Sequence, residues 1–242
     1  MYPFNKFAAA VLCLVFVDQA QAVLVEVTIT GTVQFTRATL PSVQRDDPVT
    51  AIFIIDTTAP GLDLSGPGPI FDFEGDHTAY RAGIISGSVS IGESVNLPYA
   101  LDLFRDAPGV LVRNDSSLVR DGQVLQGPLD ELRFGGNDPD PAQPQADELQ
   151  IDGIAVYGYS FFFQDQTSTA FSDSSLANVL TATFGDFEFA GAEIYSGPEI
   201  IPDRLVSIGL DGYSAEIVPI PAAAWLFGSA LGLLGWLKRR TG

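Results

Sequence analysis

The sequence predicts an all-β protein whose main domain is an antiparallel β-sandwich of jelly-roll type, with an apolar helical segment at each end. Between Val23 and Val218 the hydrophobic pattern is of strand type, in short runs separated by turn residues. Only one short stretch there favours a helix, and no internal repeat of fixed period occurs. About nine or ten strands joined mostly by turns are best accommodated in two packed antiparallel layers.

The first predicted strands set the pattern of burial. In residues 23–30 apolar and polar residues alternate, which predicts a strand with one buried face. Gly31 is predicted to mark a bulge before the strand continues. Residues 49–56 are almost continuously apolar, which predicts a strand buried on both faces.

Further strands are predicted at 85–91, 99–104, 110–113, 131–134, 149–163 with a break at Gly158, 184–195 and 205–217. A short helix is predicted over 174–180, with Asp173 as its cap. The segments 60–76 and 135–148 are rich in Pro, Gly and Asp and are predicted to be loops within one domain, spanning residues 23–217.

The charge distribution excludes nucleic acid as a partner. Residues 23–217 contain 29 acidic residues against eight arginines and no lysine, a net charge of −21. A surface of this sign repels nucleic acid and anionic lipid headgroups and favours solubility.

Residues 1–22 have the three parts of an export signal peptide. Lys6 supplies the positive flank, residues 7–17 are apolar, and Ala20 and Ala22 give the small-x-small cleavage pattern. The mature chain is therefore predicted to begin at Val23, after transfer through the secretion translocon. Cys13 is the only cysteine and lies in this segment, so the exported domain depends on its core rather than on disulfides.

Residues 218–242 combine a proline motif, an apolar helix and a basic end. The motif is Val218, Pro219, Ile220, Pro221 and Ala222, and the basic residues are Lys238, Arg239 and Arg240. A helix is predicted at about 221–237, because the prolines prevent a helix upstream. The uncharged run of residues 220–237 gives about 27 Å of helix, close to the roughly 30 Å of hydrocarbon in a bilayer. The basic end is expected on the cytoplasmic side.

This three-part order resembles the PEP-CTERM sorting signal in its VPLPA form. The resemblance implies a bacterial protein that is held in the inner membrane by one helix during transit. Exosortase, a membrane-embedded transpeptidase, would then cut near the proline motif and deliver the domain to the cell surface or the extracellular polysaccharide matrix. The sequence differs from the commonest form in having Ile220 in place of leucine, and it lacks the Pro-Glu-Pro core. An ordinary single-pass anchor is the alternative, since such anchors need no paired prolines.

Segments of the main domain also resemble the opening hairpins of secreted β-domains that carry this kind of C-terminal signal. The segments are 30–35, 47–60 and 80–84. This likeness favours the sandwich and implies no chemistry.

The residues needed for common catalytic sites are scarce, so a non-enzymatic protein is predicted. Residues 23–242 contain no cysteine, residues 23–217 contain no lysine, and no Gly-x-Ser-x-Gly motif occurs. His77 is the only histidine, which argues against a serine triad and against zinc, and it is interpreted as a polar residue of a loop at a strand entrance. No cofactor is expected apart from calcium.

Two acidic segments could supply oxygen ligands to Ca²⁺. The candidate ligands are Asp72, Glu74 and Asp76 in the first segment and Asp138 and Asp140 in the second. Neither segment has the EF-hand spacing, and solvated carboxylates are the alternative interpretation in so acidic a chain.

Aromatic residues able to stack on sugars have simpler explanations. Trp225 and Trp236 lie in the C-terminal segment, where they suit a membrane interface. Tyr157, Tyr159 and the phenylalanines that follow them are interpreted as the half-buried aromatic filling of a strand. The sequence thus predicts an exported, non-enzymatic surface or matrix protein; a carbohydrate- or calcium-binding module of lectin type and a glycan hydrolase are the alternatives.

Overall fold

The computed structural model describes residues 23–67, 72–99, 109–120, 123–137, 149–156, 158–196 and 203–218. Nearly all regular structure in these residues is strand, and every strand pairing among them is antiparallel, so the predicted all-β class is confirmed. None of the helices within these ranges has the length and apolar character needed to cross a membrane. The signal peptide, the sorting motif after Val218, the helix at 221–237 and the basic end lie outside the described residues.

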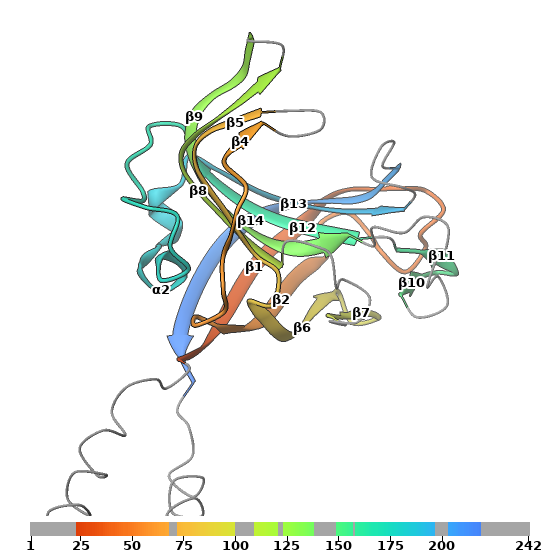
Figure 1. The fold of residues 1–242 in the computed structure, drawn as a ribbon. Coiled ribbons are helices and arrows are strands. Elements are labelled where there is room, and N and C mark those ends of the chain that lie inside the picture. Colours follow the sequence, from red (N-terminus) through yellow and green to blue (C-terminus); the bar gives the residue numbers. More distant parts are fainter. Residues whose placement is uncertain are drawn as a thin grey trace, which may run out of the picture.

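The strands are β1 (Leu24–Thr36), β2 (Pro48–Asp56), β3 (Leu62–Asp63), β4 (Gly66–Pro67), β5 (Asp72–Tyr80), β6 (Ile84–Ile91), β7 (Val95–Pro98), β8 (Gly109–Arg120), β9 (Gln123–Asn137), β10 (Gln150–Ile151), β11 (Ile154–Ala155), β12 (Gly158–Asp165), β13 (Phe189–Ser196) and β14 (Asp203–Ile217). Two short helical elements follow β12: α2 (Asn178–Thr181) and the 3-10 turn η2 (Phe184–Asp186) (Figure 1).

Hydrogen bonds join all strands except β10 and β11 into one 12-stranded sheet. Its order is β3-β5-β8-β9-β12-β13-β14-β1-β2-β6-β7, and β4 pairs with β5 beside this path. The first and last strands, β1 and β14, are neighbours within this order. The pairing continues past β14, where the backbone N–H of Val218 donates to the carbonyl oxygen of Leu24 at 2.8 Å. The sheet domain therefore begins and ends at the same place (Figure 1).

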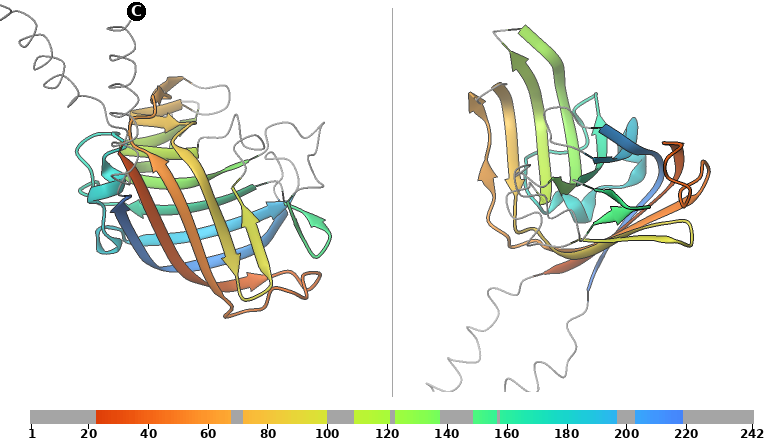
Figure 2. Two further views of the ribbon diagram at one scale, coloured as in Figure 1. Left: turned by 90° about the horizontal axis from the view of Figure 1, so that it is seen from below. Right: turned by 90° about the vertical axis from the view of Figure 1, so that its right-hand side faces the viewer.

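The sheet folds over on itself, and the core lies between its two halves. In Figure 2 the strands β1, β2 and β6 cross those of the β8, β9 and β12 half. Phe53 of β2 stacks on Phe134 of β9 with ring centres 5.8 Å apart, although four strands separate β2 from β9 in the sheet order. The two-layer packing predicted from the sequence therefore arises within one folded sheet, not from two separate sheets.

The first strand behaves as its sequence predicts. Val25, Val27 and Ile29 are fully buried. The register with β14 shifts between Thr30 and Gly31, where the bulge is predicted, but the extra residue is Asp211 of β14, because Thr30 pairs with Gly212 and Gly31 with Leu210. A Cβ at Gly31 would collide with the carbonyl oxygen of Gly209, so the close approach of the two strands requires glycine here.

The second strand differs from its prediction. Burial alternates along β2, and Ile52 is 37% exposed, so the expectation of two buried faces is wrong. In the folded sheet the core lies between the two halves, and the outer face of β2 lies outside it.

The acidic segment 60–76 is not the predicted loop, because it contains β3, β4 and the first half of β5. Gly75 has a φ of 95°, and the register between β5 and β8 shifts beside it through a bulge in β8, because Glu74 pairs with Ser117 and Asp76 with Asn114. Beyond the bulge His77 and Ala79 are buried, which the polar sequence does not indicate.

Several other predictions are confirmed at least in part. The strand predicted at 85–91 is β6, those at 110–113, 131–134 and 205–217 lie within the longer β8, β9 and β14, and β12 begins at the predicted break, Gly158. The predicted helix shrinks to the four residues of α2, with Ala177 rather than Asp173 at its N-cap. The strand predicted at 184–195 starts only at Phe189, after η2. Of the strand predicted at 99–104, only Tyr99 lies in the described residues.

The long connection between β12 and β13 packs against the core. Phe171 and Phe184 belong to it, and Phe184 contacts the ring of Phe163 edge-on at 6.4 Å. Tyr213 of β14 donates a hydrogen bond to the carbonyl oxygen of Val179. This connection, with α2 and η2, therefore adds apolar surface to the core and positions residues 173–175 next to β5.

Candidate functional site

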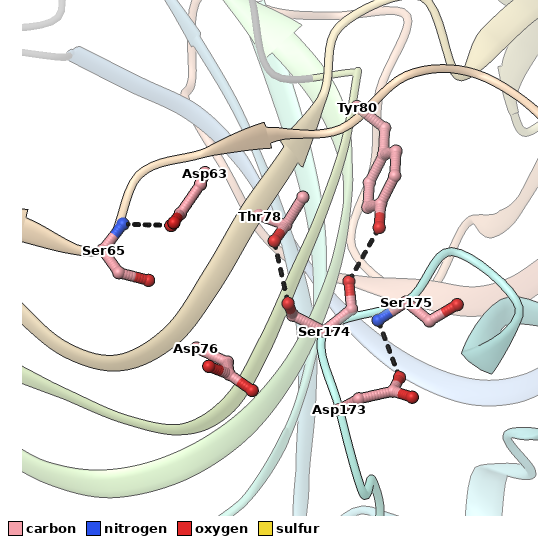
Figure 3. A pocket seen from close by; sticks show the side chains of 8 residues that line it. All are labelled: Asp63, Ser65, Asp76, Thr78, Tyr80, Asp173, Ser174 and Ser175. Carbon is pink, nitrogen blue, oxygen red and sulfur yellow. Dashed lines mark hydrogen bonds between the residues drawn. The ribbon is translucent and has the colours of Figure 1, made fainter.

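A polar pocket of about 370 Å³ lies between β5 and the segment that precedes α2 (Figure 3). Its lining contains three carboxylates and four aliphatic hydroxyls beside one tyrosine: Asp63, Ser65, Asp76, Thr78, Tyr80, Asp173, Ser174 and Ser175. These residues come from two distant parts of the chain, β3–β5 and residues 173–175. The pocket thus exists only because the β12–β13 connection is held against β5.

Hydrogen bonds from β5 hold this connection in place. The hydroxyl of Tyr80 donates to the carbonyl oxygen of Ser174 at 2.9 Å and accepts from the backbone N–H of Leu176 at 3.1 Å. The hydroxyls of Thr78 and Ser174 lie 2.8 Å apart and share a hydrogen bond. Figure 3 shows Thr78 and Tyr80 both pointing at this segment. These hydroxyls therefore build the wall of the pocket.

Local turns engage two of the carboxylates that line the pocket. Asp63 accepts a hydrogen bond from the backbone N–H of Ser65 at 2.8 Å, which lowers the pKa of Asp63. Asp173 accepts from the N–H of Ser175 at 2.8 Å. Charged acceptors and hydroxyls of this kind can bind a small polyhydroxylated or cationic ligand.

Three of the five candidate calcium ligands lie within the described residues. Asp72, Glu74 and Asp76 lie on strand β5 rather than in a loop, and Asp76 borders the pocket. Asp138 and Asp140 lie outside the described residues. Within the described ranges, no three acidic or histidine side chains are grouped closely enough to hold a metal ion.

A row of polar side chains, three of them buried and the fourth half-buried, crosses four strands. His77 on β5 lies opposite Arg113 on β8, Arg113 opposite Glu131 on β9, and Glu131 opposite Gln164 on β12. Glu131 is fully buried, and His77 and Arg113 are 3% and 8% exposed. The prediction of His77 in a loop is wrong, because it lies inside the sheet. The one sequence signal for the row is a charged residue at the edge of a predicted strand: Arg113 follows the apolar run 110–112, and Glu131 begins the strand predicted at 131–134.

Glu131 is the centre of this row. Its carboxylate lies 3.3 Å from Nη1 of Arg113 and 2.6 Å from Nε of Arg133, and it accepts a hydrogen bond from Gln164 at 2.9 Å. Burial raises the pKa of Glu131, but the two arginines and Gln164 outweigh burial and bring the pKa below its usual value. The carboxylate is therefore held ionised by partners on three strands. Because the carboxylate is closed off from water, its two ion pairs join these strands from within the protein.

The burial of His77 gives the free energy of unfolding a pH dependence that can be measured. Burial, and then the charge of Arg113, lower the pKa of His77 from 6.5 to about 4, against the opposite effect of Glu131. Below pH 6.5 the unfolded chain binds a proton at His77 that the folded chain does not, so stability falls as the pH drops from 6.5 towards 4. We expect the free energy of unfolding of the native protein, relative to His77→Gln, to fall by up to about 3 kcal/mol between pH 7 and pH 4.

Urea unfolding of the native protein and of His77→Gln across this range measures the difference. Because the carboxylates titrate in both proteins, subtracting one curve from the other isolates His77. A difference in unfolding free energy that stays constant with pH would show that His77 titrates normally.

The aromatic residues of β12 on the core side are more buried than the sequence predicts. Tyr159, Phe161 and Phe163 are all fully buried and contribute to the core, while Tyr157 lies outside the described residues. They are therefore a packing feature and not a surface for ligands.

Comparison of the chain with protein-family models, with curated proteins and with solved structures finds no match.

Proposed function

We propose that this protein is an exported, non-enzymatic surface or matrix protein, delivered by an N-terminal signal and sorted by a C-terminal signal of PEP-CTERM type. In this proposal residues 1–22 direct the chain through the secretion translocon, and the paired-proline motif from Val218 to Ala222 is where an exosortase-type transpeptidase cuts the chain. The helix at 221–237 and the basic residues Lys238, Arg239 and Arg240 hold the chain in the inner membrane until then.

The observation that carries the proposal is the position of the two ends of the sheet domain. Leu24 and Val218 are hydrogen-bonded to each other, at the end of the β1–β14 pair. A domain that begins and ends at one point can be tethered there, with the rest of its sheet projecting away from a membrane. Cuts between Ala22 and Val23 and near Pro221 would remove none of the described strands.

The sorting step is tested by replacing Pro219 and Pro221 with alanine in the full chain, expressed in a bacterium that has an exosortase. The native chain is expected to lose its C-terminal segment, because the paired prolines mark the cutting site. The double variant is expected to stay uncut and in the membrane fraction. Immunoblots of the membrane, surface and medium fractions measure the outcome.

The matched control is Pro202→Ala. Pro202 follows an isoleucine, as Pro221 does, but it precedes β14, so its replacement should leave processing unchanged. Cleavage of the double variant to the same extent as the native chain would reject the proline motif as the cutting signal, and absence of cleavage in both chains would leave the plain anchor.

A second candidate function is ligand binding of lectin type, with Ca²⁺ or a carbohydrate in the pocket of Figure 3. The hydroxyls and carboxylates around that pocket favour it. Calorimetry of the full chain with Ca²⁺, with and without Asp76→Asn, tests the cation. Heat that Asp76→Asn abolishes would support this site, and absence of heat in the native protein would reject calcium.

A further inference from the structure

The outer face of β12 and β13 carries ordered aromatic rings. Phe162 lies between the buried Phe161 and Phe163 on β12 and so points to the opposite face of the sheet. Its ring stacks on that of Phe189, which is 54% exposed, with ring centres 5.8 Å apart and planes 27° apart. The guanidinium carbon of Arg133 lies 5.9 Å from the centre of the Phe162 ring. Two neighbouring side chains therefore hold Phe162 in place.

Two glycines on this face leave room for neighbouring side chains to lie over the backbone. Gly191 of β13 lies opposite Phe162, and a Cβ there would come within 3.1 Å of Cζ of the Phe162 ring. The next position across the sheet is Gly209 of β14, and a Cβ there would collide with the side chain of Gln34. The side chains of Phe162 and Gln34 thus lie over Gly191 and Gly209, which have no side chains of their own.

A second aromatic group lies further along β13, around a pocket of about 360 Å³. The pocket is lined by Phe35, Arg37, Glu193, Tyr195, Asp203 and Arg204. Arg37 forms an ion pair with Asp203, and Arg204 forms one with Glu193. Phe189 and Tyr195 are six residues apart on one face of β13, a separation of about 20 Å. We call this surface, from Phe162 and Phe189 to Phe35 and Tyr195, the outer platform.

We propose that the outer platform binds a neutral polysaccharide chain. Sugar rings have apolar C–H faces that stack on aromatic side chains, and hydroxyls that exchange hydrogen bonds with carboxylates and guanidinium groups. The platform offers aromatic rings at both ends and, between them, Glu193 and the two ion pairs. Its length of about 20 Å suits an extended chain.

The net charge of the domain favours a neutral polysaccharide over an anionic polymer and over a second copy of the domain. With a net charge of −21 over residues 23–217, the domain repels anionic polymers and a second copy of itself. The arginines of the platform do not reverse this, because Arg37 and Arg204 are each paired with a carboxylate. The inference goes beyond the proposed sorting, and binding can be measured whether or not the C-terminal segment is a sorting signal.

Affinity electrophoresis tests the proposal. The full chain, purified in a non-ionic detergent, is run on native gels that contain hydroxyethylcellulose, dextran or galactomannan, and on gels that contain alginate. We expect at least one neutral polysaccharide to retard the native protein and alginate to have no effect. Phe162→Ala/Phe189→Ala should weaken binding about tenfold or more, as should Phe35→Ala, which leaves the stacked rings of Phe162 and Phe189 unchanged.

The matched control is Val124→Ala/Leu125→Ala, which removes exposed apolar side chains from the other end of β9 and should bind like the native protein. Three results would overturn the proposal: no retardation by any of the neutral polysaccharides, equal retardation of the native protein and both platform variants, or equal retardation by alginate. Protein recovered from a failed sorting experiment can still be used here, so the two proposals fail separately.

Discussion

Replacing Glu131 with glutamine is expected to reduce the free energy of unfolding by about 3–5 kcal/mol. The change keeps the shape of the side chain but removes the charge that compensates two arginines. Arg113 is buried, so its guanidinium would stay in the sheet after losing the counter-charge of Glu131. The amide would also place a donor against Gln164, which donates to the native carboxylate. Urea unfolding at pH 7 measures the loss.

Glu93→Gln is the matched control, because Glu93 is exposed in the turn between β6 and β7, and it should change stability by less than about 0.5 kcal/mol. A second variant keeps the test informative if Glu131→Gln does not fold. Arg113→Met combined with Glu131→Gln removes both charges of one pair and should be less destabilised than Glu131→Gln alone. Equal stability of Glu131→Gln and the native protein would contradict the assigned role.

Replacing Asp165 with alanine is expected to cost about 2–4 kcal/mol and to loosen the connection that forms the pocket. Asp165 is 2% exposed and accepts five hydrogen bonds from Thr167, Thr169 and Ala170. Burial raises the pKa of Asp165, but these hydrogen bonds lower it to about 2. The stabilisation is therefore present at neutral pH and is lost as the pH falls from about 4 towards 2.

Thermal unfolding and hydrogen exchange of residues 166–188 measure these two effects. Glu188→Ala, in the same connection but exposed, is the control and should leave both unchanged. Unaltered exchange in Asp165→Ala would show that the connection is held by its aromatic contacts alone.

Strands can be predicted from the sequence where burial alternates on one face. The apolar positions of β1 follow from residue types alone, because the β14 partner only has to complete the pattern. The strand β5 cannot be predicted in this way, because its buried side chains include His77. A strand of this kind is specified by neighbours that are distant in the sequence.

The candidate sites are even less predictable. The pocket joins β5 to residues 173–175, and the Glu131 row joins four strands, so both depend on strand order, which residue patterns do not specify. The single folded sheet, which was not predicted, also depends on strand order. Residue types also do not distinguish Phe162 and Phe189 from the other aromatic residues nearby, because only the direction of each side chain separates the core from the outer platform.

The most direct test of the proposed function is the intact mass of the protein recovered from the cell surface and the culture medium. The proposal predicts a chain that begins at Val23 and ends near Pro221, with any group that the transpeptidase attaches. A mass equal to that of residues 23–242 would contradict sorting by cleavage and would identify the C-terminal helix as a permanent anchor.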